Sequence, residues 1–285
     1  MIDLHSHTSA SDGQHPPSEH VGLAARAGIR VLAITDHDTV EGLEEALAAC
    51  TPLGLRLVPG IEVSISHNRR ELHILGHFID PREPHLAAHA RTLALEREAR
   101  MVEMLRRLST VGITLTLDQV RAIAVDAPLA RPHLARALVE HRVCSSLKDA
   151  FDRFLGDGKI AHVTKGEVTG EAAIALIHRA GGTATLAHPG ASRVHRLELS
   201  ELRAAGLDGL EVDHVDHPPS QRETFRAWAH ALDLATTAGS DFHGAKVTPD
   251  RRFGSVTMTE AELALLEARR PAHAGSASTV RAPGP

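Results

Sequence analysis

The sequence contains few of the residues on which secreted and membrane proteins depend. Its two cysteines, Cys50 and Cys144, are too few for a disulfide framework. No apolar run approaches the ~20 residues that a membrane-spanning helix needs, and no basic and apolar leader segment precedes Asp3. These absences predict a cytoplasmic protein without a membrane partner, and nothing in the sequence indicates an obligate protein partner.

Basic residues are not in excess either. The chain has 31 Lys and Arg against 36 Asp and Glu, which gives a formal net charge of −5 and a pI near 6.5. Proteins that hold long duplex nucleic acid usually carry a clustered positive excess. The charge balance therefore argues against long duplex nucleic acid as a partner and leaves small anionic substrates open.

Three common catalytic motifs are also missing. The sequence has no Gly-x-Ser-x-Gly elbow, no Walker-type loop and no dinucleotide-binding Gly-x-Gly-x-x-Gly. The chain is nevertheless long enough for a well-buried core. Its 285 residues, 42% of them hydrophobic, suit one large domain or one domain with an insertion.

Histidine, in contrast, is abundant, with 21 residues in the chain. His5 and His7 follow an apolar start at Ile2 to Leu4, and alternation along a strand puts both rings on one face. Asp12 follows on a loop rich in Ser and Gly, and imidazole nitrogens with a carboxylate oxygen suit a divalent transition metal. Taken alone, the His-x-His pair also fits an exposed strand with polar residues outward.

The same arrangement recurs where other predicted strands end. Apolar runs at residues 30–34, 57–58, 183–187 and 234–238 each lead into histidines or carboxylates. Active sites of barrel-like α/β folds lie at the C-terminal ends of parallel strands and take side chains from several of them. The distribution therefore predicts a multinuclear metal hydrolase. Its candidate ligands are His5, His7, Asp12, His37, Glu62, His73, His188, Asp241 and His243.

This ordered set of donors resembles the polymerase-and-histidinol-phosphatase (PHP) family of metal-dependent phosphoesterases. The resemblance implies an α/β fold, a distorted (β/α)7 barrel that holds three divalent ions. Mn²⁺ is expected, with Fe²⁺ or Zn²⁺ as alternatives, because the donors mix nitrogen and oxygen. The family pattern assigns His5, His7, Glu62 and Asp241 to one ion, Glu62, His73 and His188 to a second, and Asp12, His37 and His243 to a third.

Predicted strands and helices alternate on both sides of a long helical stretch. Residues 1–80 and 169–268 are predicted to form the metal-binding barrel as a discontinuous domain. Residues 81–168 are predicted to be a helical insertion, because an amphipathic stretch at 86–109 is followed by shorter helical segments without a strand. Residues 269–285 are rich in Ala, Gly, Ser and Pro, and we expect them to be disordered.

The insertion carries a second functional signal. Arg131-Pro132-His133 places a guanidinium and an imidazole at a predicted helix start, where free backbone N–H groups favour an anion. Lys165 adds a further cation, so Arg131, His133 and Lys165 are predicted to bind substrate phosphate. The alternative is an ordinary helix start with solvated charges.

The Arg-Pro-His element resembles one subgroup of the family, together with Phe151-x-x-Phe154-Leu-Gly-x-Gly, Glu211-Val-Asp-His214-Val-Asp-His217 and Gly239-Ser-Asp-Phe-His-Gly244. That subgroup is the stand-alone PHP enzymes that trim nucleoside 3′,5′-bisphosphates and short RNA 5′ ends, and its members carry a helical insertion. They usually have Tyr where Phe154 and His77 stand. This chain has no Tyr at all, so any role of a phenol in substrate contact is lost or passed to another residue.

The resemblance implies hydrolysis of the 3′-phosphate of nucleoside 3′,5′-bisphosphates, such as adenosine 3′,5′-bisphosphate, or of short 5′-phosphorylated oligoribonucleotides. Clustered divalent ions lower the pKa of a bridging water, so that hydroxide attacks phosphorus without a protein nucleophile. Glu62 is the expected bridging carboxylate. A metal-bound water or His214 is expected to protonate the leaving group.

Two other functions stay open from the sequence. One is a histidinol-phosphate phosphatase or another small phosphomonoesterase, although the insertion favours a larger substrate with a second anionic group. The other is a non-catalytic PHP binding module, whose usual sign is an eroded ligand set. The set is complete in this sequence.

Overall fold

The structure is a computed structural model that describes residues 1–68, 70–124, 129–164, 166 and 168–271. The chain divides into two compact units, one of Met1–Ala87 with Val168–Pro285 and one of Ala88–Glu167. Each unit has its own cluster of buried apolar side chains. The predicted boundaries fall after residues 80 and 168, and the two units divide after residues 87 and 167.

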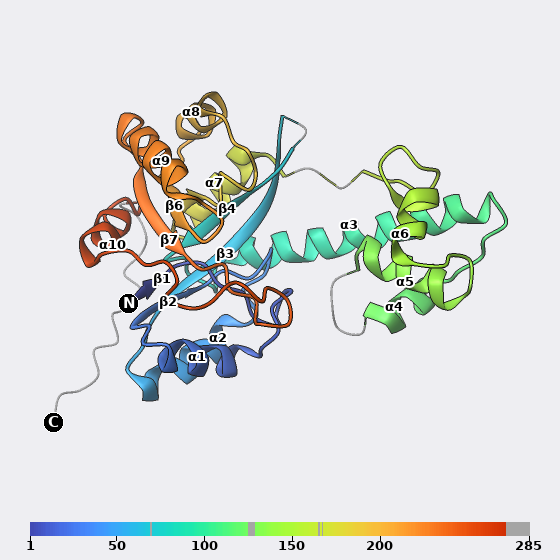
Figure 1. The fold of residues 1–285 in the computed structure, drawn as a ribbon, viewed down its shortest axis with the longest axis horizontal. Coiled ribbons are helices and arrows are strands. Elements are labelled where there is room, and N and C mark those ends of the chain that lie inside the picture. The colour runs from blue at the N-terminus through green and yellow to red at the C-terminus, as the bar shows by residue number, and fades with distance from the viewer. Residues whose placement is uncertain (69, 125–128, 165, 167, 272–285) are drawn as a thin grey trace. The chain divides into compact units, whose positions relative to one another are not determined.

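In the described part of the first unit, seven strands form one sheet in which they follow one another in chain order (Figure 1). β1, β2 and β3 are parallel neighbours, and so are β5, β6 and β7. The strands are β1 Ile2–Asp3, β2 Val31–Ile34, β3 Arg56–His67, β4 Arg70–His77, β5 Thr183–Leu186, β6 Gly209–His214 and β7 Ala235–Gly239.

The sheet nearly closes on itself, because the chain that follows β1 pairs with β7 and the residues after it. The Leu4 N–H donates to the Ala238 carbonyl at 3.1 Å, and the Asp241 N–H donates to the His5 carbonyl at 2.8 Å. The predicted α/β fold, a distorted seven-stranded barrel, is confirmed.

One strand runs against its neighbours. β3 turns back directly into β4, which is antiparallel to both β3 and β5. The register pairs Glu62 with Leu75 and Ser64 with His73, so the first half of β4 lies beside the second half of β3. The alternation of strands and helices in the sequence indicates parallel neighbours only, and it misses this hairpin.

Helices connect the parallel strands and surround the sheet (Figure 1). α1 begins at Pro17, where a missing N–H leaves no hydrogen bond unmade. α7 begins after Thr169, whose hydroxyl accepts the Ala172 N–H at 3.2 Å. The helices described in this unit are α1 Pro17–Arg26, α2 Leu43–Cys50, α7 Gly170–Arg179, α8 Arg196–Ala204, α9 Pro219–Ala231 and α10 Glu260–Glu267, with a 3₁₀ helix at Thr51–Leu53.

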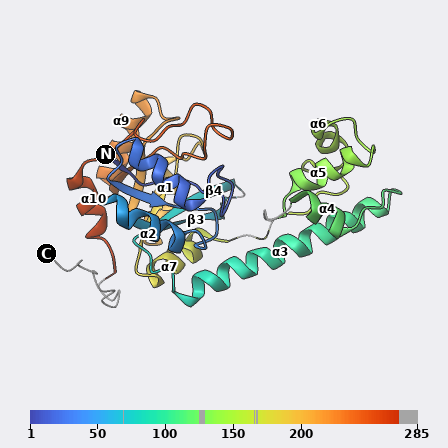
Figure 2. The ribbon, with the colours of Figure 1, turned by 90° about the horizontal axis from the view of Figure 1, so that it is seen from below.

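The second unit is helical in its described residues (Figure 2). Met101, Met104 and Leu108 of α3 are buried in its core together with Leu134 and Leu138 of α5, as the spacing along α3 predicts. None of the helices in the described part of the chain combines the length and apolar character that a membrane crossing requires. The helices are α3 Pro84–Ser109, α4 Leu117–Ala124, α5 Arg131–Glu140 and α6 Leu147–Ala150, with a π-helical turn at Phe151–Leu155.

The C-terminal segment that we expected to be disordered falls mostly outside the described residues, which end at 271. The first two residues of that segment are tied to the barrel. Arg269 donates to the Asp233 carbonyl and to its carboxylate, both at 2.8 Å, and Arg270 donates to the Gly181 carbonyl at 3.0 Å. Order in the first unit therefore continues past the predicted boundary at residue 268.

Gly60 lies in β3, two residues before Glu62, at a point where neighbouring strands leave no room for a side chain. An added Cβ would lie 2.9 Å from the backbone carbonyl oxygens of both Ile34 and Gly76. These atoms cannot move without opening the sheet. We expect Gly60→Ala to lower the free energy of unfolding by about 1–3 kcal/mol, which a fall in Tm would report.

Gly22 in α1 provides the matched control. An added Cβ there would meet the Arg26 guanidinium at 3.4 Å, and Ala favours a helix interior over Gly by up to ~1 kcal/mol. Gly22→Ala should therefore keep or raise Tm. Equal Tm values for the two variants would contradict the close packing at Gly60.

Candidate metal centre

All nine predicted ligands belong to the first unit, where the ends of its strands bring them together. Four parallel strands deliver ligands just past their C-terminal ends, as is typical of barrel enzymes, and the β3–β4 hairpin delivers two from within. In chain order they are His5 and His7 after β1, Asp12 on the following loop, His37 after β2, Glu62 in β3, His73 in β4, His188 after β5, and Asp241 and His243 after β7.

Glu62 lies at the centre of this group, and it is 1% exposed. Its two oxygens face five imidazoles, as those of a bridging ligand would. Oε1 lies 2.8 Å from His73 Nδ1 and 3.1 Å from His188 Nε2, and Oε2 lies 3.0 Å from His7 Nε2, 3.3 Å from His5 Nε2 and 3.3 Å from His37 Nδ1.

Asp241 is the second buried carboxylate of the group. Its Oδ1 lies 3.4 Å from His5 Nε2, 3.3 Å from His7 Nε2 and 3.4 Å from His243 Nδ1. His5 and His7 thus stand between Glu62 and Asp241. These four residues are the set that the family pattern assigns to one ion.

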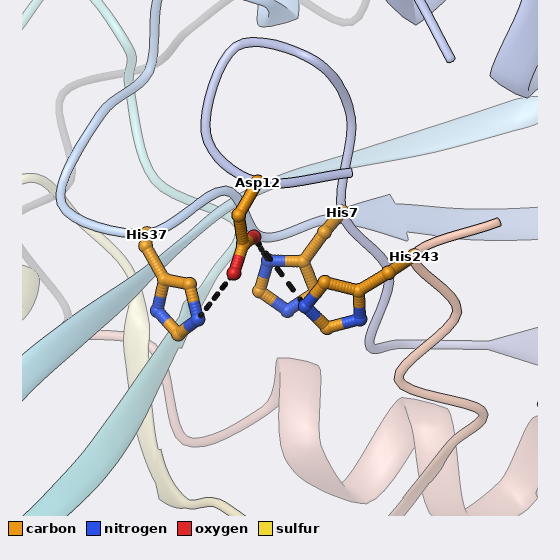
Figure 3. Close-up of side chains that lie close together, drawn as sticks. All are labelled: His7, Asp12, His37 and His243. Carbon is orange, nitrogen blue, oxygen red and sulfur yellow. Dashed lines mark ion pairs between the residues drawn. The ribbon is translucent and has the colours of Figure 1, made fainter. Parts of the chain in front are cut away.

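Asp12 forms a further cluster with three histidines (Figure 3). Its Oδ1 lies 3.4 Å from His243 Nε2 and 3.6 Å from His7 Nδ1, and its Oδ2 lies 3.8 Å from His37 Nε2. The Asp12 side chain is 53% exposed, in contrast to the buried Glu62. The loop therefore presents one solvent-accessible carboxylate to rings that are held by the barrel.

The buried ring nitrogens show that these residues fit divalent cations. Among the described residues, the buried Nδ1 atoms of His7, His37 and His73 make no hydrogen bond of good geometry, although Glu62 oxygens lie 3.3 Å from that of His37 and 2.8 Å from that of His73. Leaving a buried polar atom unpaired costs about 1–3 kcal/mol, and a cation at these nitrogens would remove that cost. Groups of three or four donors, whose ligand atoms all lie within 4.8 Å of one another, overlap at His5, His7, His37 and Glu62. Nitrogen and carboxylate oxygen together suit divalent transition metals.

Both buried carboxylates are held in the ionised form. Burial would raise the pKa of Glu62, but the surrounding imidazoles, His37 and His73 first among them, hold it well below its ordinary value. Burial acts in the same way on Asp241, and His5, His214 and His7 hold its pKa well below the usual range. Two negative charges are therefore present in a site largely closed to water.

His214 was predicted as a possible acid for the leaving group, and the geometry gives no support to that role. Its side chain is 0% exposed. Its Nδ1 accepts the Asp216 N–H at 3.2 Å, and its Nε2 lies 3.4 Å from Asp241 Oδ2. Both ring nitrogens are thus engaged within the protein, and the ring supports Asp241.

Two residues that touch the ligands were missed by sequence reasoning. Glu211 of β6 is fully buried, and its Oε1 lies 2.9 Å from His5 Nδ1. Arg251 donates to the Asp241 carboxylate and, at 2.7 Å, to Asp216. The signals in the sequence for Glu211 are an acidic residue inside a short apolar strand and a stretch that resembles the family. Arg251, ten residues after Asp241, has no comparable signal.

The predicted anion-binding residues belong to the second unit. Arg131 opens α5, and its Nη1 lies 3.2 Å from Asp157 Oδ1. The Nδ1 of His133 accepts the Ala130 N–H at 3.2 Å, which leaves Nε2 as the ring atom available to a ligand. Lys165 lies outside the described residues.

The sequence matches the PHP domain family over residues 3–180, which is more than half of the chain. The chain belongs to the PHP family. With the clustered donors of its barrel, it is a metal-dependent phosphoesterase and therefore a hydrolase.

Three similar proteins have named activities. A 5′-3′ exoribonuclease from Haemophilus influenzae is 38% identical over 245 residues, which cover 85% of this chain and 89% of that protein. A 3′,5′-nucleoside bisphosphate phosphatase from Chromobacterium violaceum is 36% identical over 247 residues, covering 85% and 87%. The 5′-3′ exoribonuclease Rnm of Escherichia coli is 36% identical over 249 residues, covering 85% of each chain.

Two solved structures have a similar fold over almost the whole chain. One from Bifidobacterium adolescentis, assigned as a metal-dependent phosphoesterase, superposes with a TM-score of 0.77 at 32% identity and covers 95% of this chain and 96% of its own. Another, an amidohydrolase from Chromobacterium violaceum with bound sulfate, has a TM-score of 0.75 at 35% identity and covers 96% and 99%.

The two positions where PHP enzymes of the resembling subgroup usually carry Tyr have different environments here. His77 is 0% exposed and its Nε2 donates to the Leu4 carbonyl at 2.9 Å, inside the barrel wall. Phe154 belongs to the second unit, where the Arg153 guanidinium lies 4.7 Å from its ring centre. The His77 ring therefore joins the end of β4 to the residue that follows β1.

Because His77 is buried, its protonation must depend on unfolding. Burial lowers its pKa to about 4, whereas an unfolded histidine titrates near 6.5. Its contribution to stability is thus complete above about pH 6.5 and is lost as the pH falls towards 4, by at most about 1.4 kcal/mol per pH unit. His77→Gln keeps a donor for the Leu4 carbonyl and cannot titrate, so its unfolding free energy should fall less steeply between pH 6.5 and 4.5.

The measurement is denaturant unfolding at several pH values, in which slopes rather than absolute stabilities are compared. His230 is exposed on α9, and His230→Gln is the control that should keep the wild-type slope. A His77→Gln slope as steep as that of the wild type would show that the acid sensitivity has another source.

Proposed function

We propose that this PHP enzyme removes the 3′-phosphate of nucleoside 3′,5′-bisphosphates, with short 5′-phosphorylated RNA as its main rival substrate. The observation that carries the proposal is the complete donor set around Glu62 in a chain 36% identical to a bisphosphate phosphatase over most of both lengths. Similar proteins named as exoribonucleases support RNA as the second substrate. Both cysteines of the chain are buried and unpaired, which supports a reducing, cytoplasmic setting.

The barrel is proposed to hold three divalent ions, with Mn²⁺ as the preferred metal. Such ions, when bound, neutralise phosphate charge and activate water. Glu62 would serve two ions at once, because its two oxygens face different histidines. Asp12 would complete the third site from its exposed loop, where it remains accessible to ligands from solvent.

Recognition of a second phosphate is proposed for Arg131, with His133 and Lys165. An arginine and a histidine of the second unit already converge on one carboxylate, since Asp157 Oδ1 lies 3.2 Å from Arg131 Nη1 and 3.3 Å from His162 Nε2. The start of α5 adds free backbone N–H groups, which favour an anion. An anion with more charge than one carboxylate would bind these groups more strongly.

The metal requirement can be tested with Glu62→Gln. Chelator should abolish hydrolysis, Mn²⁺ should restore it, and metal analysis should find up to three ions per chain. Partners that merely orient a ligand cost about 10–100-fold when they are removed, so loss of the bridging carboxylate should lower kcat/KM by more than about 100-fold. It should also cost more than the loss of any single histidine.

Glu262→Gln is the control, because this carboxylate bonds Thr259 and Arg226 and none of the nine candidate ligands. It should keep metal content and activity. Near-wild-type turnover by Glu62→Gln, or full wild-type activity in excess chelator, would contradict the proposed site.

The substrate can be tested with Arg131→Ala. Each charge-assisted contact to a phosphate contributes about 1.5–3 kcal/mol, so the two bonds of a guanidinium fork predict a preference of about two to four decades in kcat/KM. Adenosine 3′,5′-bisphosphate should exceed 3′-AMP, 5′-AMP and histidinol phosphate and yield 5′-AMP. A short 5′-phosphorylated RNA should be the nearest competitor.

Arg131→Ala should erase the preference and leave slow hydrolysis of a generic phosphomonoester. Arg136→Ala, at an exposed arginine further along α5, should leave the ranking of substrates unchanged. A ranking led by histidinol phosphate would favour the alternative function of a small phosphomonoesterase. If Arg131→Ala leaves the ranking of substrates unchanged, Arg131 does not take part in substrate recognition.

A further inference from the structure

We propose that Glu211 is a positioning residue that holds two of the metal ligands, His5 and His188, in the form and place in which they bind. The inference rests on the proposed function in one respect, the assignment of His5 and His188 as ligands. Glu211 lies in β6, a strand that contains none of the nine candidate ligands.

The carboxylate of Glu211 is fully buried and has two protein partners at hydrogen-bond distance. Oε1 lies 2.9 Å from the Nδ1 of His5, and Oε2 accepts the backbone N–H of His188 at 2.7 Å. A buried carboxylate persists only when its oxygens are satisfied. From β6, the side chain therefore links the segment after β1 to the segment after β5.

Gly239 of β7 packs closely against His5 and Glu211. An added Cβ at Gly239 would lie 2.2 Å from the His5 Cβ and 3.0 Å from Glu211 Oε1. Any side chain at position 239 would thus displace the His5–Glu211 contact. The glycine is an independent sign that the fold makes room for this contact.

The first effect of Glu211 is on the tautomer of His5. A carboxylate accepts hydrogen bonds, so the Nδ1 of His5 carries the proton and Nε2 keeps its lone pair. The Nε2 atom lies 3.3 Å from Glu62 Oε2 and 3.4 Å from Asp241 Oδ1. Glu211 therefore leaves the Nε2 lone pair of His5 available to a cation held between this ring and the two buried carboxylates.

The second effect is on the backbone at His188. This residue has a φ of +28°, in the region that side-chain-bearing residues rarely adopt. The bond from its N–H to Glu211 holds that conformation, and the ring then places Nε2 3.1 Å from Glu62 Oε1. One carboxylate thereby sets the ligands on both sides of Glu62.

Both contacts require an acceptor, which distinguishes Glu from Gln at this position. An amide has one acceptor oxygen, so Glu211→Gln can satisfy His5 or His188 but not both. If the amide N–H₂ faces His5, the proton of the ring moves to Nε2 and blocks the lone pair. Glu211→Asp keeps two acceptor oxygens on a shorter arm and should lose less.

Asp208, the residue directly before β6, offers a matched control. Its Oδ2 lies 2.7 Å from the Nε2 of His178 and accepts the Ala184 N–H at 2.8 Å. It thus makes the same two kinds of contact, to an imidazole and to a backbone N–H. His178 is not among the nine candidate ligands, so Asp208→Asn perturbs stability without touching the donor cluster.

The experiment titrates Mn²⁺ into chelator-treated full-length wild type, Glu211→Gln, Glu211→Asp and Asp208→Asn by calorimetry, with Tm measured for each. We expect Glu211→Gln to weaken at least one Mn²⁺ site by about 10–100-fold, Glu211→Asp to fall between it and the wild type, and Asp208→Asn to bind as the wild type does. Wild-type Mn²⁺ affinity and stoichiometry in folded Glu211→Gln would overturn the proposal.

Nitrogen NMR of the histidine rings supplies a test that needs neither activity nor a folded variant. In wild-type protein loaded with diamagnetic Zn²⁺, His5 should carry its proton on Nδ1 and bind the metal through Nε2. A proton on Nε2 of His5 would overturn the role of Glu211 even if bisphosphate hydrolysis is confirmed. The expected tautomer in an enzyme that fails to cleave bisphosphates would support Glu211 and sink only the proposed substrate.

Discussion

The carboxylate of Glu62, buried among imidazoles, is the constraint on which the rest of the barrel depends. A buried charge is costly unless it is paired or binds a cation. Asp241 adds a second buried negative charge that shares His5 and His7 with Glu62. Divalent cations match this excess of negative charge and lone pairs. The metal dependence of the PHP family thus has a direct electrostatic cause in this chain.

The reversed strand β4 solves a problem that a purely parallel barrel would leave. In parallel strands, ligands reach the site from C-terminal ends, and each needs its own helix to return the chain. By turning straight back after β3, the chain brings the first half of β4, with His73, beside the second half of β3, with Glu62. Two ligands to one centre therefore come from a single hairpin. This explains why His73 stands early in its strand while His188 and Asp241 stand after theirs.

The sequence predicts the metal donors because short-range spacing and the ends of apolar runs mark them. It does not predict contacts between residues that are far apart in the chain. Pairs such as His5 and His7 reveal themselves by spacing, and apolar runs reveal the strands before them. Glu211 lies in a stretch that resembles the family, but nothing local assigns it a role, because its partner His5 lies 206 residues away. The same holds for His214, whose contact with Asp241 exists only after β6 and β7 pair. The direction of β4 was missed although the chain between β3 and β4 is far shorter than the dozen or more residues that a crossover to a parallel strand needs.

The donor set can serve the hydrolysis of any phosphate ester, so the choice of substrate must depend on other residues. In the second unit, Arg131 bonds Asp157, whose side chain is 88% exposed. Exposed ion pairs contribute only ~0–1 kcal/mol, so this contact does little for the fold, and a doubly charged phosphate can replace the carboxylate at small cost. The guanidinium also lies 5.9 Å from the ring centre of Phe151, a contact that remains when Asp157 leaves. These two contacts are consistent with the proposed role of Arg131, because they position the guanidinium without committing it to a buried ion pair.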